Sequence, residues 1–384
     1  MSKIEELIQQ YCPDGVEFVS IGNLITRVRN KGGKNPTIKT VYSVSNTLGL
    51  VKAEDFRENV IYSEDTSNYI VIEQGMFAYN PARLNIGSLA WLQTNQSGLV
   101  SPMYVVFSID QTKVLPEFLF LHLKSPYVIG KINSLTESGA RFRFDFERWK
   151  LIEIPIPPIP IQREIVRLLE TFSELQSTLQ AELQKRLQQY NYYRDNLLSF
   201  EGRTDVEWKK LGEIADLGTG SHNTQDGLVE GEYPFYTRGS EILYLNDYDY
   251  DETAIITAGD GAGVGKVFHF VEGKYALHQR AYRIVPNEKF MLARFVYYYI
   301  GATFYNYIMK SSVSSSVVSI RKPMMVNYPI PVPSLEEQQR IVSILDKFHT
   351  LTTDITAGLP AEIEARRKQY EYYRDQLLTF EKKA

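Results

Sequence analysis

A tyrosine-rich motif occurs twice in this chain, as YNYYRDNLLSFE at residues 190–201 and as YEYYRDQLLTFE at residues 370–381. Each copy ends a charged segment that begins after a run of prolines, PIPPIP from residue 155 and PIPVP from residue 329. Upstream, VEFVSIGNL at 16–24 matches VEWKKLGEI at 206–214. A repeat of this length predicts two similar halves, each a globular segment followed by a helical one.

The helical segments have the spacing of a coiled-coil seam. In the first, apolar residues recur at alternating steps of three and four, at Ile165, Leu168, Phe172, Leu175 and Leu179. A similar pattern in the second copy places Ile341, Leu345, Phe348, Leu351 and Ile355 on its seam. A helix of about 40 residues is about 60 Å long. We expect the two helices to pack antiparallel on each other within one chain; pairing with other copies of the chain is the alternative.

The second helical segment carries four extra residues and a signal for a break. Gly358 suits a helix C-terminus and Pro360 suits the first turn of a new helix. We therefore expect a break near residue 358 and a helix that resumes from 362 to 380. The extra residues form a local loop under this hypothesis.

The globular segments favour strands first and helices last, which predicts an α+β fold. In the first segment we expect strands over 40–45, 59–63, 69–73, 76–80, 88–93 and 103–108, and helices over 116–124 and 126–134. In the second we expect strands over 254–257, 266–271 and 281–285, and helices over 291–300 and 303–310. The proline runs are interpreted as stiff polyproline connectors.

The N-terminus joins the repeat pattern. At an offset of 190, Leu7 and Ile8 fall on Leu197 and Leu198. Residues 3–11 are therefore interpreted as the remnant of a helix end. Packing of this helix near the C-terminus would close a ring-like arrangement, and a separation above about 30 Å between residues 8 and 378 would contradict it.

The sequence shows no catalytic or metal-binding motif. Gly259–Lys266 resembles a phosphate-binding loop, but Asp260 and Val267 stand where that motif requires glycine and serine or threonine, so a strand-to-strand turn is favoured. The base-holding loop of adenine methyltransferases, Asn/Asp-Pro-Pro-Tyr/Phe, does not occur. The histidines are scattered and Cys12 is the single cysteine, which predicts no zinc site and no internal disulfide. We expect no metal, no membrane span and a cytoplasmic protein.

The net charge of −4 requires any DNA-binding surface to be a local basic patch. One candidate is Thr26–Thr40, which has five basic and no acidic residues, although a solvated loop fits equally well. Another is Ser138–Phe144, where arginines alternate with phenylalanines, together with its counterpart Ser314–Lys322. The candidate DNA contacts are Arg27, Arg29, Lys31, Lys34, Arg141, Arg143, Arg238, Lys266, Arg280, Arg321 and Lys322.

The combined pattern of two variable globular segments, proline runs, Gln-containing helix starts and Tyr-x-Tyr-Tyr-Arg-Asp motifs resembles the specificity subunit of type I restriction-modification systems. The resemblance implies an N-terminal helix over 1–14, target-recognition domains over 15–158 and 204–332, and spacer helices over 159–203 and 333–384. It also implies an internal pseudo-twofold axis. Helix packing and partner contacts are then expected at Phe172, Leu179, Tyr190, Tyr193, Leu197, Phe348, Ile355, Tyr370, Tyr373 and Leu377.

The same resemblance implies the partners. Each domain would read one half of a split double-stranded DNA target, about one helical turn apart. The helices would dock two modification subunits, which supply S-adenosylmethionine and methyl transfer, while restriction subunits supply ATP, Mg²⁺ and cleavage. The chain itself would be non-catalytic and hold no cofactor. The alternative is a coiled-coil scaffold whose globular domains bind proteins; a self-sufficient methyltransferase is disfavoured by the missing base-holding loop.

Overall fold

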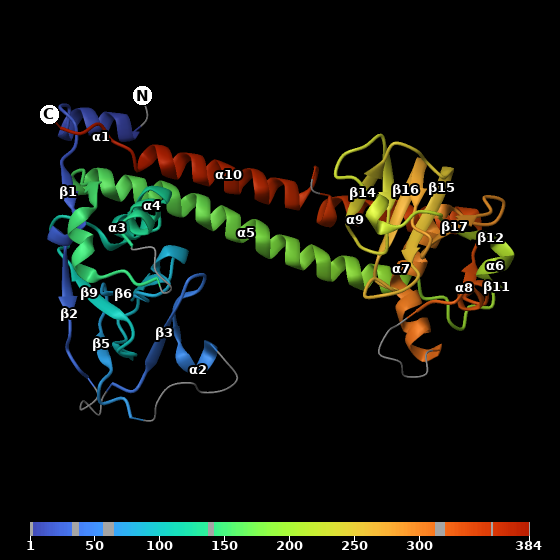
Figure 1. The fold of residues 1–384 in the computed structure, drawn as a ribbon, viewed down its shortest axis with the longest axis horizontal. Helices are drawn as coiled ribbons and strands as arrows, with labels where there is room; N and C mark the ends of the chain where they lie inside the picture. Colours follow the sequence, from blue (N-terminus) through green and yellow to red (C-terminus); the bar gives the residue numbers. More distant parts are fainter. Residues whose placement is uncertain are drawn as a thin grey trace. The chain divides into compact units, whose positions relative to one another are not determined.

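The computed structural model describes residues 3–32, 38–56, 65–136, 142–311, 319–354 and 356–383 (Figure 1). The chain forms two compact units. Unit 1 contains residues 1–177 and 365–384, and unit 2 contains residues 178–364. Each unit therefore takes one globular domain together with part of both helical segments, which differs from the separate spacer predicted from sequence. The predicted domain limits remain a proposal.

The long helices occur where the periodicity places them. Helix α5 (Ile159–Leu197) is continuous over 39 residues, whereas the second copy is divided into α9 (Leu335–Thr353) and α10 (Leu359–Leu377). Gly358 has a φ of +89°, in the left-handed region that glycine adopts at helix ends. The carboxylate of Asp354 accepts hydrogen bonds from the N–H groups of Thr356 and Ala357. The predicted break near residue 358 is confirmed.

Unit 1 contains two four-stranded sheets covered by short helices (Figure 1). One sheet has the order β2 (Ile25–Val28), β9 (Val105–Ile109), β6 (Phe77–Tyr79), β7 (Leu89–Trp91), and the other β4 (Gly49–Lys52), β3 (Val41–Ser45), β8 (Gly98–Val100), β5 (Ile70–Ile72). Strands β1 (Phe18–Ser20) and β10 (Glu153–Pro155) pair separately. The helices are α1 (Lys3–Tyr11), α2 (Ala53–Phe56), α3 (Pro116–Leu123) and α4 (Pro126–Ser134), with 3-10 turns η1 (Ile21–Asn23), η2 (Leu84–Ile86) and η3 (Phe146–Leu151).

Unit 2 contains one six-stranded sheet. Its order is β12 (Ala215–Thr219), β17 (Ala281–Pro286), β15 (Tyr250–Ala258), β16 (Phe268–Leu277), β13 (Tyr233–Tyr236), β14 (Ile242–Leu245). Strands β11 (Glu207–Lys210) and β18 (Pro329–Val332) pair separately. The remaining elements are α6 (Leu211–Ile214), η4 (Thr224–Asp226), α7 (Ala293–Ser311) and α8 (Lys322–Val326). Both units thus have the predicted α+β composition.

The strand registers show that the two domains are structural repeats. Ile25 pairs with Ile109 in unit 1, and Ala215 pairs with Pro286 in unit 2, so β2 and β9 correspond to β12 and β17. In the same way β6 and β7 correspond to parts of β15 and β16, through the pairs Phe77–Trp91 and Ile255–Phe270. The offsets of 190 and 177 residues are those at which the sequences match. The predicted internal repeat is therefore present in the hydrogen-bonding pattern itself.

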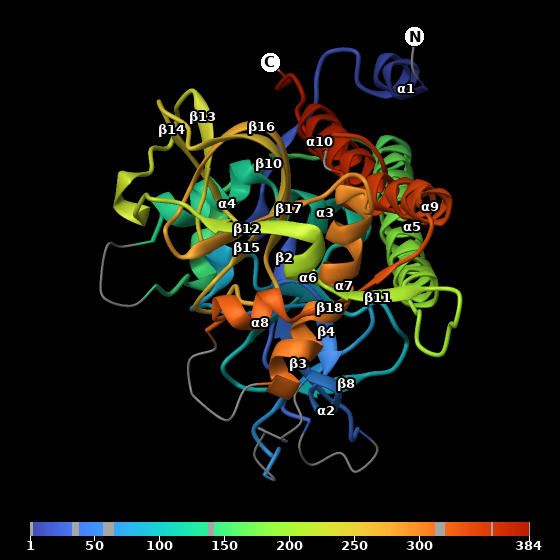
Figure 2. The same ribbon diagram turned by 90° about the vertical axis from the view of Figure 1, so that its right-hand side faces the viewer.

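The sheet of unit 2 is strongly bent (Figure 2). The N–H of Leu277, at the end of β16, bonds Asp249, just before the start of β15. Only four residues later Ala281 pairs with Ala258, at the opposite end of β15. Four residues span at most about 14 Å, whereas a straight strand from 249 to 258 is about 30 Å long. The sheet must therefore curl, which brings the end of β13 and the end of β15 close to the start of β17.

Two sequence predictions about these elements are wrong. The start of each proline run is a paired strand, since Phe18 pairs with Pro155 in β10 and Trp208 pairs with Pro331 in β18. Strand β18 covers most of the second run, whereas β10 ends at the first proline of the first run. Proline has no N–H to donate. It fits here because each ladder has only two strands, so the proline nitrogen can lie on the side that has no neighbouring strand. The two helices expected over 291–310 are the single helix α7. In unit 1 Pro126 starts a new helix after Ser125, but the corresponding residue in α7 is Thr303, which does not interrupt the backbone hydrogen bonds.

A buried glutamine holds each long helix to its domain. Gln162 in α5 is fully buried; its Oε1 accepts the N–H of Leu115 at 2.9 Å, and its Nε2 donates to the carbonyls of Lys113 at 2.8 Å and Pro157 at 2.7 Å. Gln338 in α9, also fully buried, makes the equivalent bonds. They join it to the N–H of Leu292 and to the carbonyls of Phe290 and Pro333, each at 2.8 Å. Each glutamine satisfies three backbone groups at the junction between strand, proline run and helix.

The chain termini meet within unit 1. The N–H of Val16 bonds the carbonyl of Glu381 at 2.9 Å, and Lys383 bonds Val16 in return at 2.9 Å. Leu7 and Ile8 pack against the apolar cluster that contains Leu378. The predicted contact between the termini is confirmed. Leu378 of the C-terminal tail is buried in the core of unit 1, as Leu198 is in the core of unit 2, and Ile4 of α1 is buried in the same cluster as Leu378. The interpretation of 3–11 as a remnant stays a prediction.

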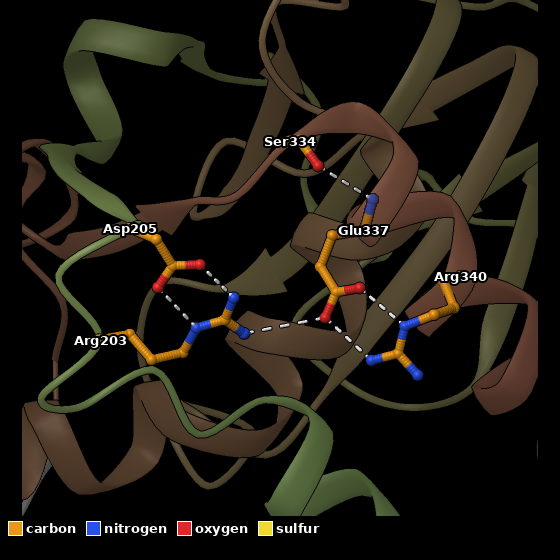
Figure 3. A network of polar contacts seen from close by, with 5 residues as sticks. All are labelled: Arg203, Asp205, Ser334, Glu337 and Arg340. Atoms are coloured by element: carbon orange, nitrogen blue, oxygen red, sulfur yellow. Dashed lines mark hydrogen bonds and ion pairs between the residues drawn. The ribbon is translucent and has the colours of Figure 1, made fainter.

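The link that leaves α5 is tied to the start of α9 by a polar network (Figure 3). Arg203 pairs with Asp205 at 2.6 Å and with Glu337 at 3.8 Å, and Glu337 also pairs with Arg340 at 2.7 Å. The Ser334 hydroxyl accepts the N–H of Glu337 at 3.2 Å, which caps α9. Hydrogen bonding by Arg340 and the charge of Arg203 keep the pKa of Glu337 below its ordinary value, despite partial burial. The network fixes where the second domain departs from the helix.

Candidate nucleic-acid interface

One loop occupies the same place in both domains. In unit 1 it joins β6 to β7 and spans residues 80–88; in unit 2 it joins β15 to β16 and spans residues 259–267. The N–H of Phe144 bonds the carbonyl of Pro81 at 2.9 Å, and the N–H of Ile320 bonds the carbonyl of Gly259 at 2.8 Å. The described ends of the two basic segments interpreted as counterparts, residues 142–144 and 319–322, therefore lie against equivalent loops. The glycine cluster of unit 2 is a strand-to-strand turn, as predicted.

The loop of unit 2 holds two predicted DNA-contact residues on one carboxylate. Arg238 donates from Nη1 to Oδ1 of Asp260 at 2.8 Å, and Arg280 donates from Nη1 to Oδ2 at 3.1 Å. Burial opposes ionisation of Asp260, but its hydrogen bonds to Arg238 and Arg280 outweigh this effect and hold its pKa below the ordinary value. We define these three residues as the Asp260 cluster.

Glycine is required for this approach. A Cβ on Gly259 would lie 2.6 Å from the carbonyl oxygen of Arg280, and a Cβ on Gly263 would collide with the carbonyl oxygen of Arg238. A side chain at residue 259 would push the loop away from Arg280, and a side chain at residue 263 would push it away from Arg238. The glycines that resemble a phosphate-binding motif thus serve to bring three backbone segments together.

Polar side chains surround the Asp260 cluster. The N–H of Arg280 bonds Nδ1 of His278 at 2.9 Å, and Nε2 of Gln279 donates to Oδ1 of Asn223. Gln279 and Asn223 are both exposed. Burial, with the nearby charge of Arg238, lowers the pKa of His278. Arginine, glutamine and asparagine are the side chains that read base edges in the major groove.

The other predicted DNA-contact residues of unit 2 lie on the loop or the segment beside it. Lys266 is exposed at the end of the loop, 5.3 Å from the centre of the Tyr305 ring. A β-bridge joins Asp260 to Ser319, two residues before the exposed Arg321 and Lys322 at the start of α8. The structure therefore gathers the five predicted basic residues of unit 2 around one loop.

The predicted residues of unit 1 are distributed less tightly. Arg27 in β2 is exposed and lies 5.9 Å from the centre of the Phe146 ring, and Arg143 is exposed beside the buried Phe144. The charges of Arg27 and Arg143 both act on Tyr79, the last residue before the loop, although burial is the larger influence and raises its pKa. These two arginines therefore flank the loop of unit 1.

The remaining candidates of unit 1 differ in their surroundings. Arg29 is exposed. Lys31 donates to Oδ1 of Asn68 at 2.9 Å, which restrains it on the edge of the domain. Lys34 and Arg141 lie outside the residues that the structure describes, as does the predicted strand over 59–63.

Sequence reasoning missed several residues at these loops. Arg83, exposed on the loop of unit 1, stands alone in the sequence and gave no signal. Asp260, Asn223 and Gln279 were missed because their partners are 20 or more residues away, at the ends of other strands. The acidic stretch 247–252 serves structural contacts, since Asp249 accepts the N–H of Leu277 and Glu252 pairs with Arg283.

The predicted helix-packing residues make equivalent ring contacts in the two units. Phe172 stacks on Tyr373 in unit 1, and Phe348 stacks on Tyr193 in unit 2, each with ring centres 5.4 Å apart. Tyr190 also lies 6.4 Å from Phe348. The other predicted positions, Leu179, Leu197, Tyr370 and Leu377, are half-buried, and Ile355 lies outside the described residues.

The seam is less regular than its sequence pattern. Leu175 is 39% exposed, whereas Leu169, which the 3-4 spacing omits, is buried in the core of unit 1. Tyr193 and Tyr373 keep 45% and 40% of their surface exposed after stacking. The helices thus pack within the chain and still present aromatic surface.

Within the described ranges, no group of three or more histidine, cysteine or acidic residues is arranged to hold a metal ion. None of the helices in those ranges is long and apolar enough to cross a membrane. Neither observation identifies a reaction.

The comparisons with known proteins decide the family. Residues 16–189 and 204–365 each match the type I restriction modification DNA specificity domain. The chain belongs to this family. This type I specificity family member is 36% identical over 321 residues to the EcoR124I/EcoR124II specificity subunit of Escherichia coli. The match covers 76% of this chain and 78% of that protein. It is 31% identical over 300 residues to a putative type I specificity subunit of Haemophilus influenzae, covering 70% and 73%.

Solved structures show the same fold at low sequence identity. A chain from a study of complex assembly and conformational transition of the type I R-M system has a TM-score of 0.63 at 16% identity, covering 95% of this chain and 97% of that one. The HsdS subunit from Thermoanaerobacter tengcongensis has a TM-score of 0.52 at 18% identity, with coverage of 95% and 96%. The structural similarity to these proteins therefore covers almost the whole length of this type I specificity family member.

Proposed function

We propose that this chain is the DNA specificity subunit of a type I restriction-modification complex, in which each globular domain reads one half of a split double-stranded target. The observation that carries the proposal is the doubled family match, over 16–189 and 204–365. The two equivalent loops support it, because each lies beside basic side chains that differ between the domains. Two loops at equivalent positions that carry different side chains are suited to recognising two different half-sites.

The helices carry the second part of the proposal. Their exposed tyrosines, Tyr193 and Tyr373, occupy equivalent positions, so they offer two similar docking sites to two copies of a modification subunit. Aromatic residues of this kind are enriched at protein interfaces. Restriction subunits would join through the same complex.

Chemistry is assigned to the partners. The chain itself is proposed to be non-catalytic and to hold no cofactor, with S-adenosylmethionine bound by the modification subunits and ATP and Mg²⁺ used with the restriction subunit. A role on chromosomal DNA places the proposed complex in the cytoplasm.

The test is methylation mapping of DNA from cells that express the chain with its modification subunit. We expect one split motif with a methylated base in each half. Replacing both Arg27 and Arg143 with alanine should weaken DNA binding by the purified complex. The slope of log K against log salt should fall by about 1 for each phosphate that the complex no longer neutralises. Replacing Lys52, exposed on the other sheet of unit 1, is the matched control. Absence of any sequence-specific methylation would refute the proposal.

The alternative scaffold function predicts a different result. A scaffold would capture protein partners through its globular domains and would show no sequence preference in a gel-shift with duplex DNA, with or without a modification subunit. The family match does not favour it.

A further inference from the structure

We infer that Asp260 is a positioning residue that fixes Arg238 and Arg280 to read guanine in the half-site recognised by the second domain. The inference rests on the proposed function. It assigns a base and a mechanism to the Asp260 cluster, which comes from three separate loops, after β13, after β15 and before β17.

The hydrogen bonds leave both arginines able to bind. Each carboxylate oxygen of Asp260 accepts one Nη1 donor, one from each guanidinium. A guanidinium has five N–H donors, and bidentate recognition of guanine O6 and N7 uses two of them. Arg238 and Arg280 are 40% and 62% exposed, whereas Asp260 is 22% exposed. The carboxylate thus lies beneath the two arginines.

The surrounding backbone keeps the carboxylate in place. Asp260 lies between Gly259 and the left-handed Gly261, which has a φ of +83°. Its β-bridge to Ser319 restrains the loop from the other side. A carboxylate held in this way limits the rotamers of both long side chains before DNA arrives, so less conformational entropy is lost on binding.

The charge of the cluster favours a base over a phosphate. Two guanidinium groups and one carboxylate carry a net charge of +1, so the long-range attraction for the DNA backbone is reduced. An arginine that only contacted phosphate would attract it more strongly without the carboxylate beside it. Base recognition depends on the direction of N–H groups, which the carboxylate fixes.

The neighbouring amides extend the surface. Gln279 precedes Arg280 and is held by Asn223, so its own orientation is also restrained. Restrained arginine and amide side chains on one surface are the arrangement expected of base readout.

The experiment compares motifs methylated by the complete complex of this chain with its modification subunits. With Asp260→Ala we expect the preference for guanine at one position of one half-site to fall by about 10-fold, and Arg280→Ala to relax the same position or its neighbour. The other half-site should keep its sequence. Non-specific DNA binding at low salt should stay equal or rise, because a negative charge has been removed.

Asp216→Asn is the matched control. Asp216 is an exposed carboxylate on β12 that also pairs with an arginine, Arg283, and its loss should leave the motif unchanged. Asp260→Asn keeps one carbonyl oxygen and should give an intermediate loss of discrimination. Near-ultraviolet circular dichroism of each variant complex confirms that the fold is retained.

The possible results separate the inference from the proposed function. If the wild-type complex methylates no split motif, the proposed function fails. If the wild-type complex does methylate a split motif, two results with Asp260→Ala would overturn the inference. The variant complex could keep the same guanine preference, or it could bind its target more tightly with undiminished selectivity. In either case Asp260 is only a structural partner or one that masks the arginine charge. A half-site that is altered by Arg280→Ala but contains no G·C pair in either orientation would also overturn the inference.

Discussion

Replacing Gln162 with methionine, which has a similar volume, should detach the start of α5 from the first domain. The change removes three hydrogen bonds to backbone groups of residues 113, 115 and 157. Each bond contributes about 1 kcal/mol net, and a buried N–H left without an acceptor adds about 1 kcal/mol or more. The expected loss is therefore about 3–5 kcal/mol. Since 1.4 kcal/mol is a factor of 10, local opening should become about 10²-fold to several times 10³-fold more frequent.

Hydrogen exchange of the full-length chain, read by mass spectrometry, measures this effect directly. The Leu115 amide loses its acceptor, so peptides over 110–123 and 155–169 should exchange faster. Gln338→Met should have the same effect on the equivalent segments of unit 2, because its three bonds join the equivalent backbone groups, those of Phe290, Leu292 and Pro333, at nearly the same lengths.

Two results would contradict the reasoning. A loss below about 1 kcal/mol for Gln162→Met would show that the bonds are replaced or contribute little. A similar loss for Gln180→Met, at an exposed position of α5, would show that the effect is not specific to the buried glutamine, because surface substitutions usually stay within about 0.5 kcal/mol.

Three further changes test other features. Gly358→Ala should destabilise the α9–α10 junction by about 1–2 kcal/mol, because alanine disfavours positive φ and its Cβ would meet the carbonyl of Thr350; exchange of residues 348–362 reports it. Burial lowers the pKa of His122 to about 3, so unfolding takes up a proton below about pH 6.5. Unit 1 should therefore lose stability as pH falls from 6.5 towards 3, and His122→Phe should flatten this dependence in thermal melts. An unchanged pH profile in the variant would show that His122 does not cause the loss. Leu378→Ala should cost unit 1 about 2–4 kcal/mol and leave the exchange of unit 2 unchanged, whereas Leu198→Ala should do the reverse.

Features set by local sequence could be predicted from the chain alone. Proline and glycine act through their own backbone, so the helix start at Pro126 and the break at Gly358 were both readable. The repeat could be read because matched residues, such as Phe172 and Phe348, make matched contacts. The continuity of α7 was missed because its apolar pattern has no clear period, although Thr303 offered no reason for a break.

Features that depend on distant partners could not be predicted. The start of each proline run is a strand because it pairs with β1 or β11, which lie more than 100 residues upstream, and nothing within the runs identifies those partners. The Asp260 cluster required the bend of the sheet, which follows from the short connection between Leu277, bonded to Asp249, and Ala281, paired with Ala258. The sequence singles out Arg238 and Arg280 as separate basic residues, but it does not reveal the carboxylate that they share.

Because the tail after α10 completes the core of unit 1, the domain that a ribosome makes first is the one that is finished last. The strands of unit 1 emerge early, yet Leu378 and Phe380 join its core only after residues 178–364 have been made. Unit 2 is one uninterrupted stretch, residues 178–364, and has all of its parts before that point. Removal of residues 378–383 would therefore damage the core of the N-terminal domain and leave unit 2 with all of its parts.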